Sequence, residues 1–107
     1  SDDIQTIEQC KAFLPHLLEK LHERMENHKK RTGKPVRLRT QGVKLKFNDF
    51  QLTTVEHRHA VLEEHYFATL MEEAFERAKG RGIRLVGIHI GLAAHQSTQQ
   101  LILPFDD

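Results

Sequence analysis

The spacing of apolar residues changes along this chain, and that change limits the folds the chain can form. Between Thr6 and about Asn27 apolar residues recur every three or four positions, as on one face of a helix. They are Ile7, Cys10, Phe13, Leu14, Leu17, Leu18, Leu21 and Met25. A second run of this kind extends from about Glu63 to Lys79, with Gly80 or Gly82 placed to end it. The sequence therefore predicts two amphipathic helices.

The first helix carries two local signals near its start. Thr6 and Gln9 have the spacing of a capping box, in which each side chain accepts a hydrogen bond from the other residue's backbone N–H. Pro15 removes one backbone hydrogen bond and crowds the carbonyl of Lys11. We therefore expect a kink near Leu14 or a broken first turn.

A period of two replaces the helical spacing in the middle of the chain. Val43, Leu45 and Phe47 alternate with Lys44 and Lys46. This alternation predicts a strand with one buried face and one solvent-exposed face.

A hairpin and a last strand complete the predicted sheet. Upstream of residue 43 the apolar parity reverses, which indicates a bulge or a strand start at Gln41-Gly42. Asn48-Asp49 supplies turn chemistry, and residues 51–58 form the returning strand. In the last strand, residues 83–92, Arg84 shares one side with Val86, Ile88, Ile90 and Leu92, and the other side holds Leu85, Gly87 and His89. The predicted class is α+β, with two helices on one face of an antiparallel or mixed sheet and the other face free for a partner.

Charge is segregated along the chain although its total is small. The 107 residues carry 16 Lys+Arg and 15 Asp+Glu, for a formal net charge of +1. Six of the eleven residues 29–39 are basic, and a second basic cluster lies at Arg77, Lys79, Arg81 and Arg84. The acids lie elsewhere, so we expect one basic and one acidic face, which keeps nucleic acid as a candidate partner.

Several function classes receive no support. The mostly apolar stretch 83–94 is far shorter than the ~20 residues of a membrane-spanning helix. The residues after Ser1 do not have the form of a signal peptide, and the lone Cys10 fits a reducing, cytoplasmic compartment. No nucleophile with a neighbouring base, no glycine-rich phosphate loop and no paired carboxylates are visible, so this chain alone is not predicted to be an enzyme.

A metal site is a weak alternative. His57, His59 and His65 could supply imidazole ligands, with Asp49 or Glu56 as a carboxylate. No cysteine pair and no paired-histidine helix spacing accompany them, so no metal is predicted.

Three blocks, residues 41–51, 82–88 and 100–105, resemble in this order the C-terminal little finger domain of the Y-family translesion DNA polymerases, its bacterial polymerase IV subfamily in particular. The resemblance extends from about Ile4 to Phe105. It implies a cytoplasmic, nucleoid-associated bacterial protein, with a β-α-β-β-α-β domain that grips primer–template duplex DNA and a tail that binds the sliding clamp. The catalytic palm carboxylates and their Mg²⁺ lie upstream in this family, so this chain is expected to be a non-catalytic part, without its own cofactor, of an error-prone polymerase.

Two features depart from the family pattern. Members usually have a strand just before the first helix, and this chain begins at Ser1 about where that strand would end. The first strand is therefore expected to be missing, with a neighbouring chain or an altered sheet in its place. Many relatives also have Thr-Arg-Ser where this chain has Thr54-Val55-Glu56, so a phosphate-facing arginine is expected to be absent there.

Residues 1–94 are predicted to form the DNA-binding domain. Lys44 and Lys46 lie opposite the buried parity, four arginines could cluster nearby, and Gly87 leaves room for a phosphate unless it packs against Phe75. The predicted DNA-binding residues are Arg37, Arg39, Lys44, Lys46, Thr54, Arg81, Arg84, Gly87 and His89. Phosphate contacts carry little sequence information, and an ordinary solvated sheet face is the alternative.

Residues 95–107 are predicted to be a tail with a clamp-binding motif. The family's motif has Gln followed by Leu at its second and fourth positions and an apolar residue at its sixth. The corresponding residues are Gln100, Leu101, Leu103 and Phe105. A terminal strand would produce a similar pattern.

A free-standing RNA-binding or protein-interaction module is the alternative from another class. Sheets of that kind stack unpaired bases on surface aromatic residues. Here Phe47, Phe67 and Phe75 fall on the buried parity, which counts against it.

Overall fold

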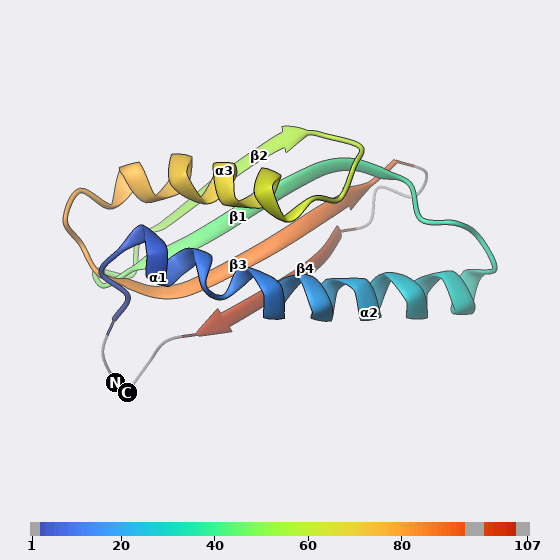
Figure 1. The fold of residues 1–107 in the computed structure, drawn as a ribbon, viewed down its shortest axis with the longest axis horizontal. Helices are drawn as coiled ribbons and strands as arrows, with labels where there is room; N and C mark the ends of the chain where they lie inside the picture. Colours follow the sequence, from blue (N-terminus) through green and yellow to red (C-terminus); the bar gives the residue numbers. More distant parts are fainter. Residues whose placement is uncertain (1–2, 94–97, 105–107) are drawn as a thin grey trace.

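The computed structural model describes residues 3–93 and 98–104, without the side chains of residues 98–101, 103 and 104. Its elements are α1 (Ile7–Lys11), α2 (Leu14–Thr32), β1 (Leu38–Phe47), β2 (Leu52–Arg58), α3 (Glu64–Phe75), a short 3-10 helix η1 (Glu76–Ala78), β3 (Ile83–Leu92) and β4 (Thr98–Pro104). The helices lie on one face of a single sheet (Figure 1). This arrangement confirms the predicted α+β class.

The predicted first helix is two helices, because the chain breaks between α1 and α2. Thr6 and Gln9 form the expected capping box at the start of α1. Pro15 lies in the first turn of α2, where its missing N–H has no helical partner to lose. The break confirms the expected interruption, and α2 continues past Asn27 to Thr32. It ends at Gly33, whose φ of 70° lies in the left-handed region that favours glycine.

The sheet has the order β2-β1-β3-β4, and every neighbouring pair is antiparallel. The bulge expected at Gln41-Gly42 is wrongly placed, since both residues pair regularly with β2 and β3. The register against β3 shifts instead between Leu38 and Thr40 and between Lys46 and Phe47. The first shift explains why the apolar parity reverses upstream of Gln41.

The core lies between the covered face of the sheet and the helices. On β1, Val43, Leu45 and Phe47 are buried as predicted. They pack with core residues of β3 and of the helices, among them Leu14, Leu17, Leu21, Phe67, Leu70, Met71, Val86, Ile88 and Ile90. Burial of each large side chain contributes about 1.5–3 kcal/mol, so this face holds the fold together.

The outer edge of β3 has two partners. Ile4 and Ile83 form an antiparallel bridge, with N–H to O distances of 3.0 and 2.8 Å in the two directions. Farther along, β4 pairs with β3 from Leu85↔Pro104 to Gly91↔Thr98. The element order predicted from the sequence lacked β4, so it was wrong here. Before α1, the described residues contribute that bridge in place of a strand.

Candidate nucleic-acid interface

The open face of the sheet, opposite the helices, is formed by the residues that alternate with the core. We use "open face" for these positions: Thr40, Gly42, Lys44 and Lys46 on β1, Leu52, Thr54, Glu56 and Arg58 on β2, and Leu85, Gly87 and His89 on β3. No helix in the described part of the chain lies over it (Figure 1).

Lys44 occupies the centre of the open face between two small neighbours. Its partners in register are Thr54 on β2 and Gly87 on β3. The alternative role for Gly87, packing against Phe75, is wrong because α3 packs on the other face of the sheet. Three predicted DNA-binding residues are thus adjacent in one row across the sheet.

A His–Glu pair crosses the next row. His89 Nε2 lies 2.8 Å from Glu56 Oε1, and the histidine ring lies over Gly42, where a Cβ would collide with it. His89 is only 5% exposed. The ring is thus buried and paired with Glu56, and the DNA contact predicted for His89 stays a prediction.

Glu56 places a carboxylate on the open face, which the sequence analysis did not anticipate. The adjacent Val55 is 3% exposed and belongs to the core. Position 55 therefore faces the helices, and this triplet presents no arginine on the open face. The charge that matters in this triplet is that of Glu56.

The four predicted arginines do not form one cluster. Arg37 and Arg39 lie at the start of β1 and are exposed, and Arg37 lines a groove with Met25, Val36, Leu38, Ala60 and Ala93. Arg81 and Arg84 lie at the opposite, hairpin end of the sheet, near the Lys46 end of β1. The basic charge is therefore divided between two ends, with Lys46 at the hairpin end and Lys44 between the ends.

The side chain of Arg81 is held against the β1–β2 hairpin by several contacts. It donates to Asp49 Oδ2 at 2.8 Å and to the carbonyl oxygens of Arg77 and Ala78 at 2.7 and 2.8 Å. Its guanidinium also lies 4.1 Å from the ring centroid of Phe47. The hydrogen bond from Arg81 is the largest cause of a lowered pKa for the Asp49 carboxyl, which is thus held charged.

Phe50, which the sequence analysis did not single out, lies at the tip of this hairpin and is 60% exposed. The Arg84 guanidinium lies 4.3 Å and the Lys46 Nζ 5.4 Å from its ring centroid. The register shift at Lys46 lets Arg84 reach this ring despite its buried-side parity. A lone aromatic residue in a turn carries no periodicity, so the only sequence signal beside it was the Asn48-Asp49 turn.

The histidines considered for a metal have other partners. His57 Nε2 lies 3.1 Å from Glu73 Oε2, the ring of His59 stacks on Tyr66 at 3.7 Å, and His65 lies 3.6 Å from Glu63. Within residues 3–93 and 98–104, no group of three or more His, Cys, Asp or Glu side chains is arranged to hold a metal ion.

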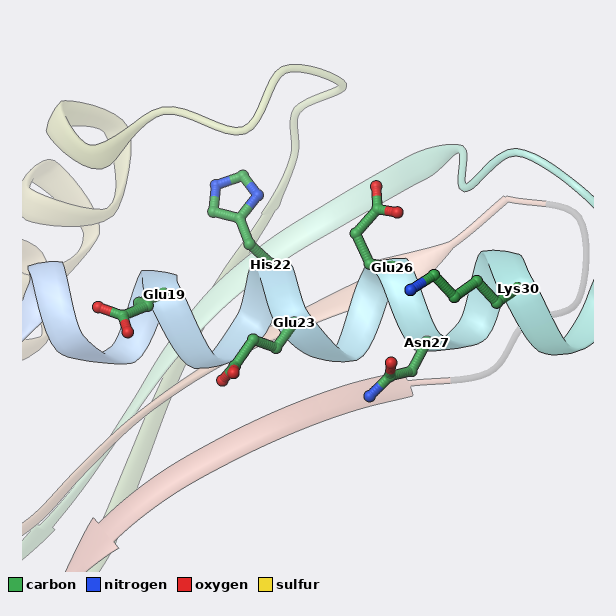
Figure 2. A pocket seen from close by; sticks show the side chains of 6 residues that line it. All are labelled: Glu19, His22, Glu23, Glu26, Asn27 and Lys30. Carbon is green, nitrogen blue, oxygen red and sulfur yellow. The ribbon is translucent and has the colours of Figure 1, made fainter.

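The helix side carries most of the carboxylates. A shallow hollow along α2 is lined by residues of this one helix, three of them glutamates: Glu19, His22, Glu23, Glu26, Asn27 and Lys30 (Figure 2). Acidic side chains there would repel phosphate, so this hollow is not a nucleic-acid site. The predicted separation into one basic and one acidic face is incomplete, because Lys29, Lys30 and Arg31 end this same helix and Glu56 lies on the open face.

Cys10 is fully buried in the core, and burial raises the pKa of its thiol to about 12. A thiol that stays protonated is a poor nucleophile, so this cysteine has a packing role.

No helix among the described residues has both the length and the apolar character needed to cross a bilayer.

Most of the predicted clamp-binding residues lie in β4. Gln100, Leu101 and Leu103 pair in register with His89, Ile88 and Val86. Phe105 is outside the described residues.

An α+β domain with one face covered by helices and one open, partly basic face is the class of protein that these observations define. Residues 1–103 match the impB/mucB/samB family C-terminal domain, and the chain belongs to this family. DNA polymerase IV of Pseudoalteromonas atlantica is 49% identical over 106 residues, and that of Shewanella pealeana is 44% identical over 96 residues. The matches cover 99% and 90% of this chain but only 29% and 26% of those relatives. The chain thus spans less than a third of their length.

A solved structure gives the same assignment for the fold. It is described as a complex of the beta-clamp processivity factor and the little finger domain of PolIV. It matches with a TM-score of 0.77 and 36% identity over 94% of this chain and 88% of that one. The resemblance to the little finger domain of translesion polymerases is therefore confirmed.

Proposed function

We propose that this chain is the DNA-gripping and clamp-tethering domain of an error-prone translesion DNA polymerase of the polymerase IV type. The observation that carries this proposal is the open face, where Lys44 and Lys46 lie on the one side of the sheet that no described helix covers. The similarity to polymerase IV over almost the whole chain supports the same assignment.

The open face is suited to DNA binding that does not depend on the base sequence. Lys44 lies between Thr54 and Gly87, so neither neighbour in its row carries a long side chain beside the ammonium group that would contact a phosphate. Lys46 and Arg84 extend the positive charge to the hairpin end. Each phosphate that is neutralised releases counterions, and about four to six contacts would make binding fall steeply with salt.

Titration of labelled primer–template duplex at several salt concentrations tests this grip. Lys44→Ala with Lys46→Ala is expected to reduce the slope of log affinity against log salt by about one for each lysine. Lys20→Ala with Lys30→Ala, on α2, is the matched control and should leave the slope close to that of the unsubstituted chain. An unchanged slope in the open-face variant would contradict the proposal.

The clamp tether is assigned to Gln100, Leu101, Leu103 and Phe105. Because residues 98–104 pair with β3 along their backbone, docking of this segment in a clamp pocket requires the segment to leave the edge of β3. Loss of that pairing offsets part of the docking energy, which favours affinity of about micromolar strength. A weak tether is sufficient where duplex DNA is bound at the same time, since effective concentration then raises overall affinity.

Calorimetry with a bacterial sliding clamp tests the tether. The full chain is expected to bind at about micromolar strength, and a chain that ends at Gln99 is expected not to bind. Leu103→Ala with Phe105→Ala should abolish clamp binding and leave DNA binding intact. Equal loss of both activities would contradict the division of labour.

Catalysis and its Mg²⁺ are assigned to the rest of the parent polymerase. We expect that polymerase in the cytoplasm, and at the nucleoid when it is active.

The alternative of an RNA-binding module requires exposed aromatic residues for base stacking. Phe47 and Phe67 are buried and Phe75 is partly buried against the core, and the exposed Phe50 lies in the hairpin turn rather than on a strand of the sheet. Preference of the chain for single-stranded RNA over primed duplex DNA would favour that alternative.

A further inference from the structure

The tip of the β1–β2 hairpin exposes the large apolar ring of Phe50, which is unfavourable in water. Phe50 is the most exposed of the four large hydrophobic residues that protrude in the described chain. Its φ of 69° is in the left-handed region, which costs a bulky residue energy that glycine or asparagine would avoid. A strained, exposed aromatic residue therefore calls for a reason beyond the fold.

The turn that presents Phe50 is rigidly held. Phe50 N–H donates to the Phe47 carbonyl at 2.9 Å, and Phe47 N–H donates to the Gln51 carbonyl at 2.9 Å. Arg81 anchors the same turn through Asp49, which in turn accepts from Gln51 N–H at 3.1 Å. The ring thus projects from a preorganised turn, so that little entropy is lost when a ligand packs on it.

Two cations converge on this ring from two different strands. Lys46 approaches from β1 and Arg84 from β3, at 5.4 and 4.3 Å from the ring centroid. The result is an apolar surface with positive charge beside it, contiguous with the open face. A ligand that matches it combines an apolar patch with negative charges at close intervals.

We propose that Phe50, Lys46 and Arg84 form a subsite for one strand of duplex DNA, in which the Phe50 ring packs on a deoxyribose and the two cations contact the adjacent phosphates. The deoxyribose offers a C–H surface that remains accessible in a paired duplex, whereas the base faces are stacked. The subsite extends the grip to the hairpin end of the open face and rests on the proposed function. It accounts together for the exposure, the left-handed backbone and the paired cations.

Titration of the chain with labelled primer–template duplex tests the subsite, with Phe50→Ala, Phe50→Tyr and a control, Val61→Ala. Val61 is similarly exposed, at 56%, but lies in the loop after β2 at the other end of the sheet. Loss of a direct sugar contact is expected to weaken binding about three- to ten-fold for Phe50→Ala at every salt concentration, with an unchanged salt slope. Phe50→Tyr keeps the ring and is expected to bind like the unsubstituted chain, as is Val61→Ala.

Each other outcome overturns the subsite. If Phe50→Ala binds as tightly as the unsubstituted chain, the ring does not contact DNA. If its salt slope falls, the ring acts only by positioning Lys46 and Arg84. If it weakens single-stranded DNA more than duplex, the ring stacks on bases instead. If the unsubstituted chain itself does not bind duplex in a salt-dependent way, the proposed function fails, which separates the two ideas.

Discussion

The two faces of the sheet are built from alternate residues of the same strands, yet they follow opposite rules. On β1, Leu45 is fully buried, while the lysines on either side of it are partly exposed. The covered face is mainly apolar packing with Gln41 as a buried polar exception, and the open face holds lysines, glycines, Leu52 and one His–Glu pair. Stability and binding therefore depend on alternate positions, and single substitutions should separate them.

The largest expected effect is on the covered face. Leu45→Ala removes a fully buried side chain and is expected to lower the free energy of unfolding by about 2–5 kcal/mol. Its neighbour Lys44→Ala should change that free energy by less than about 0.5 kcal/mol. Urea denaturation measures both, and similar losses for the two variants would show that the faces are not energetically distinct.

Gly42 lies on the open face, and a larger residue there should still destabilise the fold. A Cβ there would collide with the His89 ring and lie 2.9 Å from the Val55 carbonyl oxygen. Gly42→Ala is expected to lower the free energy of unfolding by about 1–3 kcal/mol, because the ring and the strand must shift. A double-mutant cycle with His89→Ala checks the cause, since removal of the ring should recover part of the loss. Strict additivity would mean that the collision with His89 is not the source.

A charge change on the open face should affect binding and not folding. Glu56→Gln removes a carboxylate from among the DNA-facing positions and is expected to tighten duplex binding about two- to five-fold at low salt. Glu73→Gln, on α3, removes an equal charge from the covered side and serves as the control. Weaker binding by Glu56→Gln would instead indicate that the grip needs the Glu56–His89 pair.

The smallest expected effect is at the hairpin, where the two faces meet. Arg81 lowers the pKa of Asp49 in the folded chain. The pair therefore stabilises the fold fully when the pH is above the pKa that Asp49 has in the unfolded chain. This stabilisation is lost as the pH falls through the lower pKa of Asp49 in the folded chain. Asp49→Asn should therefore be slightly less stable than the unsubstituted chain at pH 7 and equally stable near pH 2. Thermal unfolding at the two pH values measures the difference in stability between the two chains. A difference that grows on acidification would contradict the prediction.

Periodicity predicted most of the secondary structure because it reflects local geometry. The alternation of Val43, Leu45 and Phe47 identified the covered face of β1, and the Thr6–Gln9 spacing located the start of α1. The strand β4 was only an alternative interpretation of the tail, because its pairing with β3 depends on an edge that the sequence does not reveal. Lys44 and Lys46 were placed correctly on the uncovered side, whereas their use in binding remains a prediction.

The details of the candidate interface depended on contacts between distant residues. The sequence offered His89 as a DNA contact, and only the arrangement of the strands on either side of β1 showed that His89 is paired with Glu56. Phe50 was passed over because a turn residue has no periodic signal, and Arg84 reached it through a register shift. Such features arise from register and packing, which no local pattern encodes.

The sequence by itself determined which residues avoid water and which charges remain in it. That was enough for the α+β class, for two faces of opposite character and for the family resemblance. Only the tertiary structure decided which charges meet: Arg81 with Asp49, His89 with Glu56, and two cations on one exposed ring. The physical reason is that burial follows the local period of the backbone, whereas electrostatic pairing acts over a few ångströms between residues far apart in the chain.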